Sequence, residues 1–145
     1  MIDHITLHVH NTSTSLAFYD AALRPLGYIE KVRHGETVGI GEDDGTPRAD
    51  FYIAPALGES HQNASEGPHR VEDSSPITHL AFRAKSQDEV RAFYDAALAA
   101  GGTDNGGPGP RDYHPGYYSA FVLDPDGNNV EAVVDWSHAS DDARK

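Results

Sequence analysis

Seven residues occur twice in this chain of 145 residues: AFYDAAL occupies positions 17–23 and again positions 92–98. Each copy follows a short apolar stretch that opens with a histidine, DHITLHV in the first case and THLAFRA in the second. One offset of 75 residues therefore separates the two heptads and also separates His4 from His79. Such a repeat indicates two supersecondary units that bury too little surface alone and pack together as related halves.

The first half contains one helical pattern among several strand patterns. Residues 2–10 alternate apolar and polar side chains, which predicts a half-buried strand. Residues 12–27 carry apolar side chains at helical spacing, and Gly27 is a typical helix stop. The stretches YIEKVR, TVGIG and ADFYIAP then predict three short strands. Residues 1–57 are therefore expected to form a βαβββ module.

The second half repeats this order after a polar, aperiodic stretch at residues 58–76, which we interpret as a connecting loop. ITHLAFRA predicts a strand, and Ser86 with Glu89 forms a capping box that opens the second helix. The turn-rich residues 101–116 are expected to hold a short strand at most, and YYSAFVLD and NNVEAVVD predict two strands joined by a tight turn. We predict a second βαβββ module at residues 77–136, a frayed tail at 137–145, and a single α+β domain over 1–145.

The composition excludes several classes of function. The chain has no cysteine, so it has no disulfide, thiolate zinc site or cysteine nucleophile. A net charge of −12 argues against nucleic-acid binding, because phosphates require a basic surface. No apolar run has the length of a membrane span, and the N-terminus lacks the features of a signal peptide. We expect a cytoplasmic protein that binds neither nucleic acid nor membranes and acts on a small molecule.

A glutamate in the middle of an apolar strand is the feature most suggestive of chemistry. In NNVEAVV, strand alternation places Glu131 on one face and the flanking Val130 and Ala132 on the other. Burying a carboxylate is costly unless it is paired or binds a metal ion. With His4 and His79 at equivalent positions, Glu131 completes a two-histidine, one-carboxylate set suited to a divalent cation.

Two other interpretations of these residues remain open from the sequence. Glu131 could form a buried ion pair with Arg83 or Arg111 and hold no metal. His4 and His79 could be hydrogen-bonded core imidazoles that are related only through the repeat.

Further candidates for catalysis lie near these residues in the chain. His8 shares a strand face with His4 and is a candidate base or hydrogen-bonding group, although a satisfied polar residue fits equally well. The segment RDYHPGYYS predicts a lid over the cleft, in which His114 and Tyr118 are candidates to orient or deprotonate a substrate. Alternatively, its tyrosines pack on a sheet without a catalytic role. The lid comprises Tyr113, His114, Tyr117 and Tyr118.

From DHITLHV to EAVVD the chain resembles the vicinal oxygen chelate superfamily, which includes glyoxalase I, extradiol dioxygenases and bleomycin- or fosfomycin-resistance proteins. The most specific match is YYSAFVLDPDGNNVEAVV. The resemblance implies a curved sheet around a metal and substrate cleft, with His4, His79 and Glu131 as ligands of Fe²⁺, Mn²⁺, Zn²⁺ or Ni²⁺. It also implies a homodimer and a substrate that chelates the ion through two neighbouring oxygens.

The resemblance leaves the reaction open. Glyoxalase I carries a fourth ligand on the last strand of its first module, where this chain has Phe51 and Tyr52. Neither phenylalanine nor tyrosine is a typical ligand for such an ion, and Asp50 begins the strand. The resemblance therefore implies glyoxalase-like lyase or isomerase chemistry or dioxygenase-like chemistry. A resistance-type protein that sequesters an antibiotic without catalysis is the alternative, and a scaffold acting through protein contacts is a third.

Overall fold

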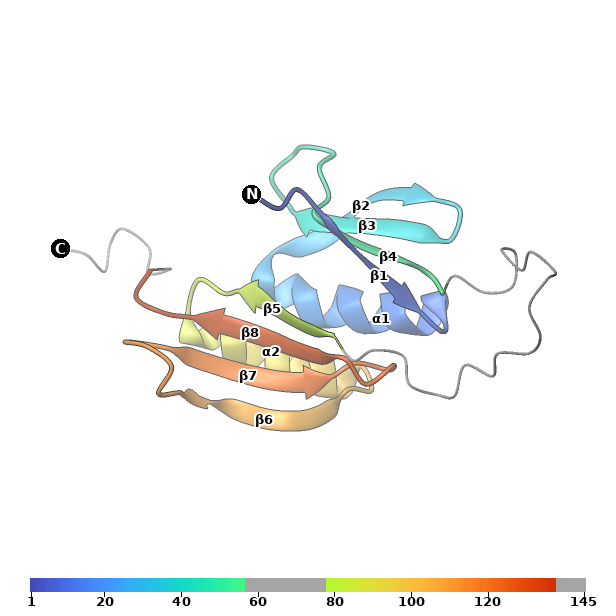
Figure 1. Ribbon diagram of the computed structural model, residues 1–145. Helices are drawn as coiled ribbons and strands as arrows, with labels where there is room; N and C mark the ends of the chain where they lie inside the picture. Colours follow the sequence, from blue (N-terminus) through green and yellow to red (C-terminus); the bar gives the residue numbers. More distant parts are fainter. Residues whose placement is uncertain (57–77, 138–145) are drawn as a thin grey trace, which may run out of the picture.

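A computed structural model describes residues 1–56 and 78–137 (Figure 1). The loop expected at 58–76 and the tail after Ser137 lie outside the described residues. The first module consists of β1 (Ile5–Val9), α1 (Thr12–Leu23), the 3₁₀ helix η1 (Arg24–Leu26), β2 (Tyr28–His34), β3 (Thr37–Glu42) and β4 (Phe51–Pro55). The second consists of β5 (His79–Arg83), α2 (Gln87–Ala99), β6 (Thr103–Pro110), β7 (Tyr118–Leu123) and β8 (Asn129–Val134).

The two modules have the same topology. One four-stranded sheet has the order β1-β4-β3-β2, and the other has the order β5-β8-β7-β6. In each sheet the first and last strands of the module run parallel, and the remaining pairs are antiparallel. The prediction of two tandem βαβββ modules is therefore confirmed, and the 75-residue repeat corresponds to this duplicated topology.

The helix ends follow from local sequence. The Asn11 side chain accepts a hydrogen bond from Thr14 N at 2.9 Å and caps α1. Ser86 caps α2 by accepting from Glu89 N at 3.1 Å, as the capping box predicted. Gly27 ends η1 in the left-handed region at φ 84°, a conformation that costs glycine little.

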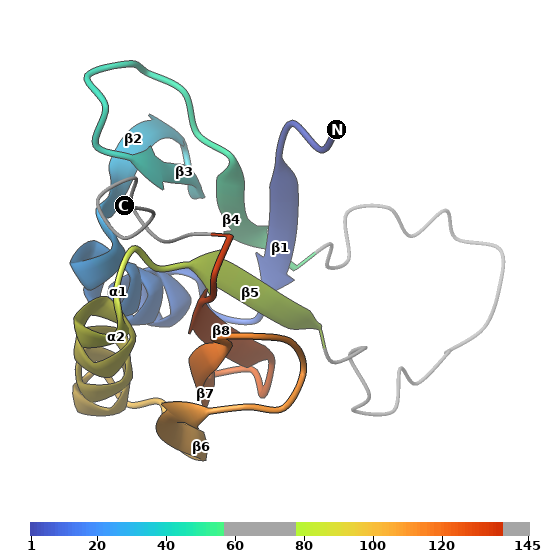
Figure 2. The same ribbon diagram turned by 90° about the vertical axis from the view of Figure 1, so that its left-hand side faces the viewer.

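Each sheet packs one face on the helices and leaves the other face free of them (Figures 1 and 2). Leu7 and Val9 of β1 and Leu80 and Phe82 of β5 point into the core, whereas the residues between them are exposed. This alternation sends every second residue of each strand to the helix-free face. The candidate ligands are found on these helix-free faces.

Buried aromatic residues join the modules into one core. The Phe82 ring lies 5.3 Å from the Phe51 ring and 5.7 Å from the Tyr28 ring, so the two sheets meet there. Tyr19 of the first heptad donates a 2.6 Å hydrogen bond to Asp124, which lies in the turn between β7 and β8. That carboxylate also accepts from the backbone N–H groups of Asp126 and Asn128. The Asp-Pro-Asp-Gly turn is thus structural.

One expectation was wrong. Residues 103–110 form an eight-residue strand, β6, where the sequence predicted a short strand at most. β6 lies at the edge of its sheet and its pairing with β7 is interrupted by register shifts. An edge strand tolerates proline and glycine because only one side must complete a ladder.

Within the described residues, neither α-helix has the length and apolar character needed to cross a membrane.

Candidate functional site

His79 and Glu131 meet on the helix-free face of the second sheet. β5 and β8 pair in parallel, with His79 opposite Asn129 and Ala81 opposite Glu131. This register brings His79 Nε2 to 3.1 Å from Glu131 Oε2. The histidine side chain is 51% exposed, whereas that of Glu131 is only 3% exposed. A buried carboxylate therefore faces an imidazole that is about half exposed to solvent.

The second nitrogen of His79 has its own partner. His79 Nδ1 lies 3.1 Å from the carbonyl oxygen of Asn129, which can only accept a hydrogen bond. A neutral ring that donates from Nδ1 has a lone pair at Nε2, directed toward the Glu131 carboxylate. Two acceptors then face each other unless a proton or a metal cation lies between them.

Tyr117 fixes the other oxygen of Glu131. Its hydroxyl donates a 2.6 Å hydrogen bond to Glu131 Oε1. Burial, followed by the hydrogen bond to Glu131, raises the pKa of Tyr117 above its usual value, so the phenol remains a neutral donor. Glu131 is thereby held with Oε1 on the phenol and Oε2 toward His79.

His114 supports Tyr117 rather than Glu131 directly. The His114 ring lies edge-on to the Tyr117 ring at 4.7 Å, and His114 Nδ1 lies 3.1 Å from Asp135 Oδ2. The Tyr113 ring contacts Tyr117 from 5.1 Å. Three residues of the predicted lid therefore form one aromatic cluster, and Tyr117 connects that cluster to Glu131.

Tyr118 lies on the other face of the sheet. Tyr118 pairs in register with Val134 of β8. Every second residue of β8, counted back from Val134, packs toward α2. The Tyr118 hydroxyl accepts a 2.9 Å hydrogen bond from Arg91. The structure therefore separates the candidate catalytic residue Tyr118 from Glu131 by the thickness of the sheet. A cavity of about 440 Å³ lies beside it, lined by Gln87, Pro110, Arg111, Asp112, His114, Pro115, Gly116, Tyr117 and Tyr118.

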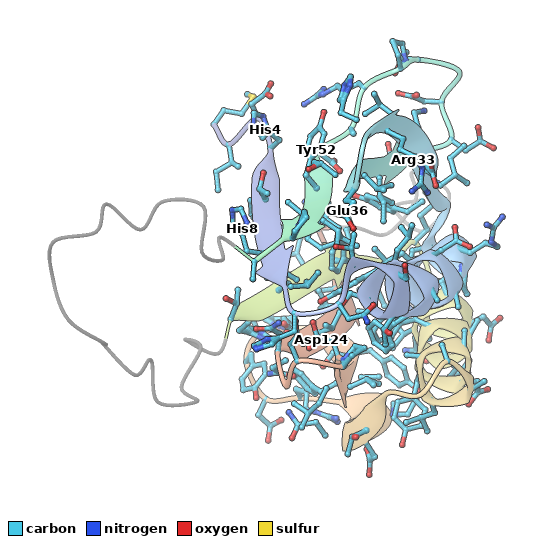
Figure 3. The ribbon with its side chains drawn as sticks, turned by 90° about the vertical axis from the view of Figure 1, so that its right-hand side faces the viewer. His4, His8, Arg33, Glu36, Tyr52 and Asp124 are labelled. Atoms are coloured by element: carbon cyan, nitrogen blue, oxygen red, sulfur yellow. The ribbon has the colours of Figure 1, made fainter. Side chains whose placement is uncertain are left out.

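The remaining candidates belong to the first module (Figure 3). His4 is 54% exposed, with Nδ1 at 2.8 Å from Asp3 and its ring at 5.4 Å from the Tyr52 ring. His8 Nδ1 lies 2.9 Å from the Pro55 carbonyl oxygen. Within residues 1–56 and 78–137, no three His, Asp or Glu side chains gather closely enough to hold a metal ion. One chain thus brings together His79 and Glu131 but not His4.

The two alternatives for Glu131 can now be compared with its contacts. Its partners are His79 and Tyr117, and neither Arg83 nor Arg111 pairs with it among the described residues. The interpretation of Glu131 as half of an arginine ion pair therefore does not agree with the structure. The sequence predicted Tyr117 in a lid over the cleft but not its hydrogen bond to Glu131, because that contact depends on how residues 111–117 fold over the sheet.

Comparison with known proteins agrees with this architecture. Residues 1–132 match the family model described as the Glyoxalase/Bleomycin resistance protein/Dioxygenase superfamily. The chain belongs to this superfamily. The family predicted from the sequence is thus confirmed, although no curated protein is significantly similar to the chain.

Solved structures of superfamily members share the fold. A glyoxalase/bleomycin resistance protein from Albidiferax ferrireducens T118 is 30% identical, with a TM-score of 0.65 over 90% of this chain and 95% of that one. A glyoxalase-related enzyme from Fulvimarina pelagi is 22% identical, with a TM-score of 0.63 over 92% and 86%. A lactoylglutathione lyase from Agrobacterium tumefaciens is 19% identical, with a TM-score of 0.60 over 92% of each chain.

The duplicated topology of the superfamily also identifies the first-module counterpart of Glu131. Ala81 pairs with Glu131, and its counterpart 75 residues earlier, Thr6, pairs with Tyr52. Tyr52 therefore occupies the position equivalent to Glu131, and its ring lies beside His4 as Glu131 lies beside His79. Each module thus carries a histidine and a neighbouring polar side chain at matching places, with a phenol in one and a carboxylate in the other.

Proposed function

We propose that this chain is a metal-dependent enzyme whose small-molecule substrate chelates a divalent ion through two neighbouring oxygens. The observation that carries the proposal is the pairing of His79 Nε2 with Glu131 Oε2 at 3.1 Å while His79 Nδ1 is committed to the Asn129 carbonyl. A metal-binding histidine commonly donates its second N–H to a carbonyl or carboxylate in this way.

The distances fit a metal ion. Two ligand atoms, each about 2.0–2.2 Å from a divalent ion and at roughly right angles, stand about 3.0 Å apart. The His79–Glu131 separation of 3.1 Å is close to that value. A cation beside Glu131 would also neutralise a carboxylate that is 3% exposed and has no lysine or arginine partner among the described residues.

Each residue around the pair has a defined role in this proposal. The bound ion would supply Lewis acidity that polarises the substrate oxygens. The Asn129 carbonyl holds the tautomer of His79 that leaves Nε2 free to bind it. Tyr117 holds Oε1 of Glu131 and leaves Oε2 for the ion, and His114 buttresses the Tyr117 ring. His114 therefore acts through Tyr117 as a positioning residue.

We further propose that His4 completes the site from a second copy of the chain. His4 and His79 occupy equivalent, exposed positions on the helix-free faces of the two sheets, yet one chain does not bring them together. A two-fold dimer would place the first module of one copy against the second module of the other, and it would form two identical sites. His8 lies on β1, which begins directly after His4, and Tyr52 of β4 lies beside the His4 ring, so both would border that site.

The experiment is a subunit complementation. His4→Ala and His79→Ala chains are expected to bind little metal separately. After equal amounts are unfolded together and refolded, half the dimers are mixed, and each mixed dimer holds one intact site of two. The metal content should therefore recover to about one quarter of that of the wild type.

Three results would contradict parts of this proposal. Wild-type chain that takes up no Mn²⁺, Zn²⁺, Ni²⁺ or anaerobic Fe²⁺ would refute metal dependence and favour a protein that only sequesters its ligand. Full metal binding by the His79→Ala variant would exclude His79 as a metal ligand. If both variants lose metal and the mixture recovers none, the site does not form between copies. Refolded wild-type chain serves as the control for recovery.

A further inference from the structure

The guanidinium of Arg111 is held in a fixed place at the end of β6. Nη2 donates a 2.7 Å hydrogen bond to the Gly107 carbonyl oxygen, and Nη1 donates a 3.1 Å hydrogen bond to that of Pro110. Its Cζ lies 5.5 Å from the centre of the Phe121 ring, within the range of a cation–π contact. These contacts use two of its five N–H groups and leave three as donors.

The glycines of β6 make room for this guanidinium. A Cβ atom at Gly109 would lie 3.1 Å from Arg111 Nη1, closer than most side chains tolerate. A Cβ atom at Gly106 would lie 3.0 Å from the Phe121 ring and 3.5 Å from Arg111 Nη2. The run GGPGP, which matches no phosphate-binding loop, therefore has a physical role in seating Arg111 over Phe121.

Phe121 connects Arg111 to the proposed metal pair. It is the direct partner of Glu131 in the β7–β8 register, so both side chains lie on the same face of the sheet. Its ring centre lies 6.2 Å from that of His79, with the two planes inclined by 32°. Arg111 and His79 thus lie against one aromatic ring, on the face that carries Glu131.

The charge of Arg111 is not matched by an acid of the described chain. Four other basic side chains are paired with acids, namely Arg24 with Asp20, Lys31 with Asp44, Arg33 with Glu30, and Arg91 with Asp88. Arg48, Arg83 and Lys85 also form no ion pair among the described residues, so what distinguishes Arg111 is that its unpaired guanidinium is held in place by two carbonyls and an aromatic ring. Arg111 has only carbonyl and aromatic contacts among the described residues, in a protein of net charge −12. A seated cation without an acidic partner is suited to recognising an anion.

We propose that Arg111 binds an anionic group of the substrate, a carboxylate or a phosphate, while two neighbouring oxygens of the same molecule chelate the ion at His79 and Glu131. This inference rests on the proposed function and narrows its substrate class to oxyanions. Arg111 would select the substrate and would not take part in bond making. The three remaining N–H donors can fork onto two oxygens of one oxyanion.

The test compares two probes that share the same pair of vicinal hydroxyls. Catechol has no further charge, whereas 3,4-dihydroxybenzoate adds a carboxylate. Titrated calorimetrically into Mn²⁺-loaded full-length protein, wild type should bind the carboxylate probe more tightly. Arg111→Met should weaken that binding about tenfold or more and leave the catechol and Mn²⁺ affinities unchanged. Arg111→Lys should recover part of the preference, and Arg24→Met should behave as wild type.

A metal-free arm separates this inference from the proposed function. Benzoate and inorganic phosphate are titrated into metal-free protein and followed by amide chemical shifts, with shifts near residue 111 expected in wild type and absent in Arg111→Met. If none of Mn²⁺, Zn²⁺, Ni²⁺ and anaerobic Fe²⁺ binds but these shifts depend on Arg111, the metal proposal fails and anion recognition stands. If Mn²⁺ binds and Arg111→Met keeps the full carboxylate preference, the role of Arg111 is refuted. The role of Arg111 is also refuted if Arg111→Met binds the two probes, benzoate and phosphate as well as the wild type does.

Discussion

Replacing Glu131 with glutamine separates a metal ligand from a structural residue. The amide keeps nearly the same volume, and its oxygen can still accept the hydrogen bond that Tyr117 donates to Oε1. Its N–H can donate to His79 Nε2, which lies 3.1 Å from the present Oε2. All three side chains therefore retain partners in the metal-free protein, and the free energy of unfolding should change by no more than about 1 kcal/mol.

The effect on the metal-loaded protein should be much larger. Replacing the only carboxylate ligand by a neutral amide should weaken metal binding about 100-fold or more, since changes to groups that merely support ligands already cost about 10- to 100-fold. At a metal concentration 100 times the wild-type Kd, binding stabilises the wild type by about 2.7 kcal/mol. The same concentration would stabilise the Glu131→Gln variant by only about 0.4 kcal/mol.

Thermal melts with metal and with chelator measure both quantities. For a chain of this size about 2.7 kcal/mol corresponds to a Tm increase of roughly 6–10 °C, which the variant should lose almost completely. Glu30→Gln is the matched control, because Glu30 is an exposed partner of Arg33 on β2, in the other sheet from His79. A loss of about 3 kcal/mol or more that is unchanged by chelator would mean that Glu131 is structural, and the reasoning would be refuted.

Three further predictions concern the fold. Tyr19→Phe should lower the free energy of unfolding by about 1–2 kcal/mol in urea melts, because it removes the buried 2.6 Å hydrogen bond to Asp124; an unchanged midpoint would contradict this. Gly102→Ala should cost about 1–3 kcal/mol or more, because its Cβ would lie 2.4 Å from a Val122 methyl and 2.7 Å from the Phe18 ring. Burial raises the pKa of Tyr28 to about 12, so its contribution to stability is complete below about pH 10 and declines as the pH rises toward 12. Tyr28→Phe should therefore lose less stability than wild type between those pH values, and parallel alkaline curves would count against the argument.

The sequence alone determined the features that depend on local periodicity. Alternation with a period of two placed Glu131 on the opposite strand face from Val130 and Ala132, and the repeat related His4 to His79. The helix cap at Ser86 likewise requires only a few neighbouring residues. These features were predictable because each follows from backbone geometry over one or two turns, and the family resemblance extended them to a whole fold.

Only the tertiary structure decided which side chains meet. Tyr117 and Tyr118 are adjacent in sequence, yet one binds Glu131 and the other binds Arg91 on the opposite face of the sheet. Which tyrosine faces the carboxylate depends on where the loop ends and β7 begins, and a shift of one residue would exchange them. The position of the Arg111 guanidinium similarly depends on β6 joining the edge of the sheet, although the glycines and prolines of β6 favour turns. Contacts of this kind are set by strand register and loop path, which local side-chain patterns do not encode.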